Sequence, residues 1–183
     1  MLKLQLHDRP ESMVPDLKIA AQAAARGMEV LIIGHLREKN NGTQPNRYGL
    51  PKSNYYADAA KNVEANSSGN VATVEIEKDG IALHYEGGTV RPKKKALAIP
   101  IDPSVAGIWP SEASGIGTGG ADDEPYALIW PKGSNHGFIK NTETNDLLWL
   151  LVPKATIPAD PSVLPTDDAI LNAAEEAVWE AVS

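Results

Sequence analysis

The stretch Tyr85–Ile101 reads Y-E-G-G-T-V-R-P-K-K-K-A-L-A-I-P-I, and several independent local signals meet in it. Gly87-Gly88 frees the backbone for a turn or bulge, and Arg91-Pro92 disfavours helix because a residue before proline is pushed toward extended conformations. Ala96–Ile101 then resumes an apolar run in which alternate side chains share one face, the pattern of a strand. The stretch therefore predicts two strand segments joined by an exposed basic tip.

The sequence immediately upstream predicts a β-hairpin. Val71–Glu77 and Ile81–Tyr85 both alternate apolar and polar side chains, and Lys78-Asp79-Gly80 separates them. Asp-Gly between two alternating segments is a strong short-range hairpin signal, because both residues tolerate the left-handed turn conformation. We therefore expect the two segments to pair with each other.

A long helix is expected over residues 12–39, with Ser12 as its N-cap, because apolar side chains recur at spacings of three and four. Gly27 and Gly34 interrupt it seven residues apart on one side, at a cost of up to about 1 kcal/mol each relative to alanine. Close packing against a neighbour, in this chain or another, is the physical reason we expect for them. The apolar stripe consists of Val14, Leu17, Ala21, Ala24, Met28, Leu31 and His35/Leu36.

A second long helix is predicted at the C-terminus. Thr166 is its expected N-cap, Asp167 and Asp168 suit the positive end of the helix dipole, and Trp179 is expected to be buried. Leu147–Val152 is apolar on both faces, which predicts a central strand. Weaker patterns predict a strand at 2–6, a short helix at 54–63 and a strand at 126–130.

Length and composition favour one globular domain. The chain has 183 residues, of which 42% are hydrophobic, with 14 prolines, 15 glycines and a formal net charge of −7. We expect a single α+β domain over residues 1–183: a mostly antiparallel sheet of about five or six strands packed by the N-terminal and C-terminal helices. A flexible loop insertion at 102–124, anchored by Trp109, and a proline-rich arm at 153–165 complete the expected architecture.

Residues for catalysis or metal binding are not recognisable in the sequence. The chain has no cysteine, its four histidines are scattered, and no serine lies in a G-x-S-x-G context. The glycine-rich run 115–120 has no strand before it and no helix after it, so we interpret it as a flexible loop and not as a phosphate-binding loop. No apolar run has the length of a membrane span. Catalysis therefore cannot be argued from these residues, and we expect no cofactor, no metal and no membrane span.

Arg91, Lys93, Lys94 and Lys95 form the only strong basic cluster in this acidic chain. Three interpretations remain: a solvated turn that blunts a strand edge, a protruding arm that contacts an acidic surface on a neighbouring subunit, or a contact to DNA. DNA is the least favoured, because four charges give only a weak and salt-sensitive attraction and the whole chain is acidic.

Taken in order, these segments resemble a family of tailed-bacteriophage morphogenesis proteins, the tail-completion or neck proteins of Mu-like prophages. The resemblance lies in R-Y-G-L-P-K-S-N-Y-Y-A-D-A-A (residues 47–60), G-G-T-V-R-P followed by K-K-K and A-L-A-I-P, and L-L-W-L-L-V-P-K-A-T-I-P-A-D-P-S-V-L-P near the C-terminus. It covers roughly residues 12–105 and 145–183, and the glycine-rich segment between them matches no pattern of the family.

The resemblance implies a structural role without catalysis. It implies a virion subunit that forms a ring of six copies at the junction of head and tail, after assembly in the host cytoplasm. Its partners would be neighbouring neck and tail-tube proteins, and genome DNA would pass through the lumen without specific binding, which suits an acidic chain. Arg91, Lys93, Lys94, Lys95, Gly27, Gly34 and Trp109 are the candidate inter-subunit contacts.

Two alternatives stay open at this point. Within the same class, the chain is a tail-terminator or head-closure protein at an adjacent neck position. In a different class, it is a monomeric binding module or accessory enzyme, with Trp109, Trp130 and His136 lining a pocket.

Overall fold

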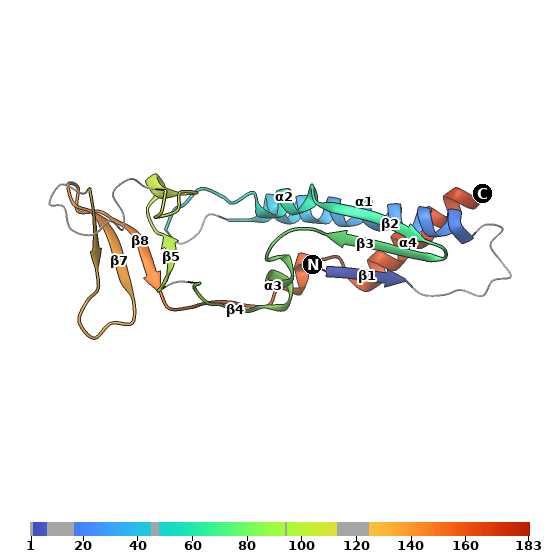
Figure 1. Cartoon of the computed structure of the whole chain (residues 1–183). Helices are drawn as coiled ribbons and strands as arrows, with labels where there is room; N and C mark the ends of the chain where they lie inside the picture. The colour runs from blue at the N-terminus through green and yellow to red at the C-terminus, as the bar shows by residue number, and fades with distance from the viewer. Residues whose placement is uncertain (1, 7–16, 45–47, 94, 113–124) are drawn as a thin grey trace. The chain divides into compact units, whose positions relative to one another are not determined.

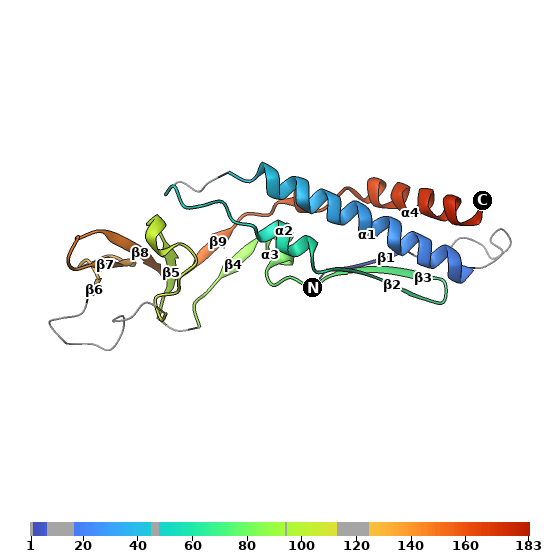
Figure 2. The ribbon, with the colours of Figure 1, turned by 90° about the horizontal axis from the view of Figure 1, so that it is seen from above.

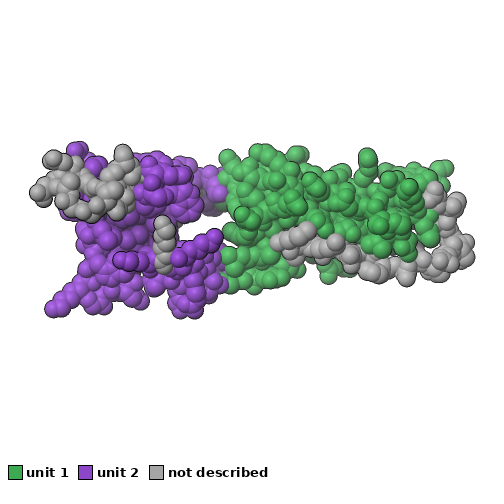
Figure 3. Space-filling model, in the orientation of Figure 1, with its two compact units in different colours: residues 1–43, 54–88, 158–183 green, residues 44–53, 89–157 purple. Residues whose placement is uncertain are grey.

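The computed structural model describes residues 2–6, 17–44, 48–93, 95–112 and 125–183, which group into two compact units (Figure 3). Unit 1 comprises Met1–Thr43, Asn54–Gly88 and Pro158–Ser183, and unit 2 comprises Gln44–Ser53 and Thr89–Ile157. The α+β class expected from the sequence is confirmed, with its long N-terminal and C-terminal helices. The strands form separate sheets of three, two and four strands.

Unit 1 is built on a three-stranded antiparallel sheet. Its central strand is β3 (Val71–Ile76), which pairs with β1 (Leu2–Leu6) on one side and with β2 (Val63–Ser68) on the other. Helix α1 (Leu17–Gly42) packs on the sheet, and α4 (Asp167–Val182) runs beside α1 (Figures 1 and 2).

The core of unit 1 lies between α1 and the sheet. The side that α1 buries includes Ala21, Ala24, Met28 and Leu36 of the predicted stripe, because spacings of three and four place those side chains on one face. Leu17, Leu31 and His35 are half-buried, and Val14 lies outside the described residues. The shorter elements α2 (Tyr55–Ala60), α3 (Ile81–Glu86) and the 3-10 helix η2 (Pro161–Val163) pack against the same core. Its most deeply buried members are Met28, Ile32, Leu36, Val74, Ile76, Ile81 and Val163.

Unit 2 is built on a four-stranded antiparallel sheet. The strand order is β5 (Leu97–Pro100), β8 (Leu147–Val152), β7 (Gly137–Asn141) and β6 (Tyr126–Ile129). The central position predicted for residues 147–152 is confirmed, because β8 has a partner on each side. Its Trp149 is fully buried and lies edge to face on Tyr126, with ring centroids 6.3 Å apart.

Two short pieces complete unit 2. The 3-10 helix η1 (Pro103–Val105) follows β5 and contributes Val105 to the core around Trp149. Strand β4 (Gly88–Val90), which begins at the last residue of unit 1, pairs with β9 (Ala155–Ile157).

The predicted hairpin between residues 71–77 and 81–85 is wrong. Residues 81–86 form the helix α3, which Gly80 introduces with φ 82°, and β3 pairs with β2 through the turn at Gly69, where φ is 61°. Because β1 and β2 occupy both edges of β3, no edge remains for a third partner. Ile81 is buried in the core as a helical residue.

The two strand segments predicted within Tyr85–Ile101 exist, but they do not pair with each other. Strand β4 pairs with β9 and strand β5 pairs with β8, in two different sheets. The basic residues therefore lie on a connection between sheets and not at the tip of a hairpin. The pairing partners lie 49 or more residues away in the sequence, so local sequence signals do not predict this arrangement.

Other boundaries differ from the sequence analysis in smaller ways. The first helix spans 17–42, and its expected N-cap Ser12 lies outside the described residues. Strands β2 and β7 were not predicted from the sequence. Thr166 caps α4 as predicted: its Oγ1 accepts a hydrogen bond of 3.3 Å from the backbone N–H of Ala169.

Candidate functional site

The predicted basic arm is exposed where the structure describes it. Arg91, Lys93 and Lys95 are all exposed on the connection between β4 and β5, and Lys94 lies outside the described residues. Three cations on an exposed connection are accessible to an acidic partner. Exposure alone is equally compatible with a solvated turn.

The two glycines of α1 have different surroundings. A Cβ atom on Gly27 would lie 2.4 Å from the carbonyl oxygen of Ala173 and 2.7 Å from the Cβ of Ala177. The close packing expected at Gly27 therefore takes place within the chain, against α4. At Gly34 an added Cβ would meet no atom within 4 Å. Of the two, only Gly34 leaves room for a contact from outside.

Three of the four tryptophans are largely exposed. The exposed fraction is 64% for Trp109, 48% for Trp130 and 63% for Trp179. The predicted burial of Trp179 and the predicted anchoring of the loop by Trp109 are therefore wrong. In α4 the inward positions belong to Ile170 and Ala174, and Trp179 lies on the opposite side together with Leu171.

One face of the four-stranded sheet carries an apolar row. Ile99 is opposite Leu150, Leu150 is opposite Phe138, and Phe138 is opposite Ile129, so these side chains lie side by side across all four strands. Each is only partly buried. The adjacent Trp149 points to the other face, because successive side chains of a strand alternate.

The loop between β6 and β7 brings together two of the residues proposed for a pocket. Trp130 donates its indole N–H to the carbonyl oxygen of Ser134 over 3.1 Å, and the Ser134 hydroxyl lies 3.0 Å from Nδ1 of His136. The backbone N–H of Trp109 instead binds the carboxylate of Glu112 at 2.9 Å. Trp130 and His136 are therefore connected through Ser134, whereas the hydrogen bond of Trp109 lies within residues 109–112.

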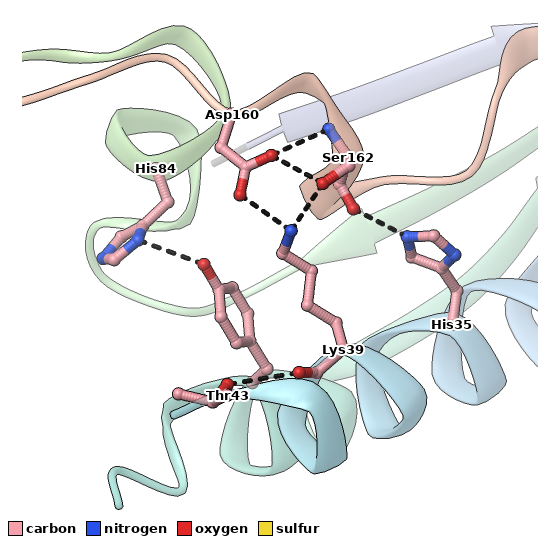
Figure 4. A network of polar contacts seen from close by, with 7 residues as sticks. His35, Lys39, Thr43, His84, Asp160 and Ser162 are labelled. Atoms are coloured by element: carbon pink, nitrogen blue, oxygen red, sulfur yellow. Dashed lines mark hydrogen bonds and ion pairs between the residues drawn. The ribbon is translucent and has the colours of Figure 1, made fainter. Parts of the chain in front are cut away.

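Unit 1 contains an open polar cleft of about 560 Å³ at the C-terminal end of α1. Lys39 crosses it and donates to Asp160 Oδ2 over 2.7 Å and to Ser162 Oγ over 2.6 Å (Figure 4). Nε2 of His35 lies 2.9 Å from the carbonyl oxygen of Ser162, as expected for a partly buried, hydrogen-bonded residue. The lining residues are His35, Glu38, Lys39, Gly42, Thr43, Tyr56, Asp160 and Ser162.

The hydrogen bonds of this cleft do not suit a serine nucleophile. Ser162 donates its hydroxyl proton to Asp160 Oδ1 over 2.6 Å and accepts from Lys39, so Lys39 does not act on it as a base. His35 contacts the backbone carbonyl and not the hydroxyl. Hydrogen bonds from Lys39, and next from Ser162, hold the pKa of Asp160 below its usual range. The network ties η2 to α1.

The sequence analysis missed Lys39, Asp160 and Ser162. Lys39 lies 121 residues before Asp160 and 123 residues before Ser162, so neither periodicity nor a local motif connects the lysine to its acceptors. A signal for the acceptor side was available, since I-P-x-D-P-S-V occurs twice in the chain, at residues 99–105 and 157–163.

The charges are divided unequally between the units. Unit 1 contains 8 Lys and Arg against 17 Asp and Glu, a formal charge of −9, whereas unit 2 contains 9 against 7, a formal charge of +2. Helix α4 alone carries Asp167, Asp168, Glu175, Glu176 and Glu180 and no basic residue. The excess of acidic residues in this chain therefore lies in unit 1.

Within the described ranges, no cluster of three histidine or acidic side chains has the arrangement of a metal site. No helix in that part of the chain combines the length and apolarity that crossing a bilayer requires. Comparison with protein-family models, with curated proteins and with solved structures finds no match to this chain.

Proposed function

We propose that this chain is a structural subunit of a tailed-phage virion, which assembles with copies of itself into a ring at the junction of head and tail. The neck or tail-completion position is the one that the sequence resemblance favours. The observation that carries the assembly proposal is the exposure of Trp109, Trp130 and Trp179. The proposal assigns no catalytic step and no cofactor to the chain.

Exposed tryptophans support assembly for an energetic reason. Burying apolar surface contributes about 25 cal/mol per Å², and tryptophan is enriched among the residues that dominate binding energy at interfaces. Single exposed apolar side chains are ordinary, so the support comes from the size of these three aromatic side chains and from the enrichment of tryptophan at interfaces. The partly exposed row Ile99, Leu150, Phe138 and Ile129 adds apolar surface in unit 2.

Charge supports the same proposal. The exposed Arg91, Lys93 and Lys95 belong to the weakly basic unit 2, and unit 1 supplies an acidic surface for them on another copy. The net charge of −7 also suits a lumen through which DNA passes without being held, because like charge repels phosphate. The partners proposed beyond the ring are neighbouring neck and tail-tube proteins.

Two other functions remain candidates. A tail-terminator or head-closure position uses the same ring chemistry at an adjacent level of the neck. A monomeric binding module or accessory enzyme is supported by one observation, the convergence of Trp130 and His136 on Ser134.

Mass in solution and presence in particles distinguish these functions. The chain is measured by light scattering after gel filtration and by native mass spectrometry over a hundredfold range of concentration, and purified virions are searched for it by peptide mass spectrometry. The ring proposal expects one closed oligomer and a fixed copy number in particles. A chain that stays monomeric and is missing from purified particles contradicts it and favours the binding module.

A further inference from the structure

Unit 2 contains a second version of the turn that holds Lys39 in unit 1. The repeated heptapeptide I-P-x-D-P-S-V follows the same course at both places in the chain. At 99–105 it leaves strand β5 and forms η1, and at 157–163 it leaves strand β9 and forms η2.

The polar contacts within the two turns are nearly identical. Asp102 Oδ1 accepts from the backbone N–H of Ser104 at 2.9 Å and from its hydroxyl at 2.5 Å. Asp160 Oδ1 accepts from the backbone N–H of Ser162 at 3.1 Å and from its hydroxyl at 2.6 Å. In both turns one carboxylate oxygen is thus used for capping, and the other is left for an outside donor.

The two turns are also anchored in the same way. Val105 is 5% exposed in the core of unit 2, and Val163 is 0% exposed in the core of unit 1. Each valine N–H donates to the carbonyl oxygen of its aspartate, over 3.2 Å from Val105 and 3.0 Å from Val163. A buried valine three residues after the aspartate fixes each turn, so its carboxylate is held in place before any partner arrives.

The turn in unit 1 binds a lysine side chain, whereas no lysine of the described ranges binds the turn in unit 2. In unit 1 the ammonium of Lys39 lies against the free carboxylate oxygen and the serine hydroxyl. In unit 2, none of the described lysine and arginine side chains is paired with Asp102. Asp102 is partly exposed and Ser104 is exposed, so the acceptor pair is accessible.

The ligand that fits this acceptor pair is a primary ammonium. Lysine presents three donors and no acceptor, which matches a carboxylate oxygen beside a hydroxyl oxygen. The turn in unit 1 demonstrates the match within the same chain, with both contacts shorter than 2.8 Å. The recognition uses side-chain oxygens and does not involve the backbone of the short η1 helix.

From this we infer that Asp102 and Ser104 form a receptor for a lysine of a second copy of this chain, supplied by Lys93 or Lys95 of its basic arm. This inference rests on the proposed ring. Each copy carries both the exposed lysines and the receptor, so the contact joins two different surfaces and can repeat from copy to copy until a ring closes. It gives the arm a specific acceptor in addition to the general attraction of acidic unit 1.

The first test compares Asp102→Asn with Asp160→Asn in the full-length protein. Asparagine retains the capping oxygen but loses the charge, so Asp102→Asn is expected to keep the fold of the chain with at most a small decrease in melting temperature. It is expected to raise the dissociation constant of the oligomer about fivefold, the effect of losing one ion pair per interface. Asp160→Asn is the matched control. It is expected to lower the melting temperature but to leave the dissociation constant of the oligomer unchanged when only the folded fraction of the protein is counted.

The second test uses the absence of cysteine from the chain. Ser104→Cys is made in one preparation and Lys93→Cys or Lys95→Cys in another, and the mixed proteins are treated with a short bismaleimide. A covalent dimer that contains one chain of each kind is expected. Lys132→Cys, an exposed lysine elsewhere in unit 2, replaces the arm variants as the control and is expected to give no such dimer.

The outcomes separate this inference from the proposed ring. An oligomer that is unchanged by Asp102→Asn and gives no mixed dimer overturns the receptor while the ring proposal stands. A chain that is monomeric at every concentration overturns both. Mixed dimers together with a weakened Asp102→Asn oligomer support the receptor. Mixed dimers that form equally well with Lys132→Cys overturn it, because the contact is then not specific to the arm.

Discussion

Lys39 and Asp160 form an ion pair with an N–O distance of 2.7 Å, and 121 residues separate them in the sequence. The lysine side chain is 19% exposed and the aspartate side chain 44%. The pair connects the last turns of α1 to η2, which precedes α4, and so adds a polar contact to the direct packing of the two long helices of unit 1 (Figure 4).

Asp160→Ala is expected to destabilise the chain by about 1 kcal/mol, because it removes the cap of η2 and the partner of Lys39 together. Chemical denaturation followed by circular dichroism measures the change. Asp58→Asn is the control, since Asp58 pairs with Lys61 at 2.9 Å but both side chains are well exposed and only three residues apart. That variant is expected to leave the midpoint unchanged, and an equal loss in both variants would contradict a special role of Asp160.

The stability of the chain is expected to fall on acidification below about pH 4. The pKa of Asp160 is lowered by the hydrogen bonds from Lys39 and Ser162, and the pKa of Asp102 is lowered by those from Ser104. A lowered folded-state pKa means that the unfolded chain binds more protons in this range, so the stabilisation exists above the unfolded value of about 3.9 and is lost as the pH falls through the folded value.

Denaturation midpoints of the wild type and Asp160→Asn from pH 7 to pH 2.5 measure this effect. The difference between the two proteins is expected to be constant near neutral pH and to shrink as Asp160 becomes protonated. A difference that grows with acidification would have the wrong sign for a lowered pKa.

Gly27→Ala and Gly34→Ala are expected to have opposite effects on folding. The new methyl at position 27 meets Ala173 and Ala177, and overpacking of this kind costs about 1–3 kcal/mol. The methyl at position 34 meets nothing within 4 Å, so the higher helix propensity of alanine is expected to stabilise the chain by about 0.5–1 kcal/mol. Thermal unfolding at a concentration where the chain is monomeric distinguishes the two, and a stabilised Gly27→Ala would show that α4 does not pack there.

Reversing the charge of the arm is expected to block assembly without unfolding the monomer. Lys93→Glu/Lys95→Glu removes the attraction to an acidic neighbour and replaces it with repulsion. Lys132→Glu/Lys154→Glu is the matched control, because both lysines are exposed in unit 2 and the change in net charge is the same. Native mass spectrometry measures the oligomeric state of both variants. Normal assembly of the arm variant would contradict the contact and favour the interpretation of the basic cluster as a solvated turn.

Several elements were predictable because their causes are local. The stripe of α1 follows from apolar spacing, Thr166 and the two following aspartates mark the start of α4, and the double-sided apolar run Leu147–Val152 marks a central strand. The same local reasoning failed at Ile81–Tyr85, where an alternating pattern and a preceding Asp-Gly fit a strand as well as a short helix.

The sequence by itself determined the α+β class, both long helices and the candidate basic arm, because propensity, capping and periodicity act within a few residues. Only the tertiary structure decided that β4 pairs with β9 and β5 with β8, that Gly27 is filled by α4 while Gly34 stays open, and that Trp109 and Trp179 face solvent. The lysine-binding turn is recognised only when the sequence and the tertiary structure are considered together. The heptapeptide is repeated in the sequence, but the partner of Asp160 is revealed only when residues 121 positions apart are brought together, because such a contact depends on the packing of whole elements.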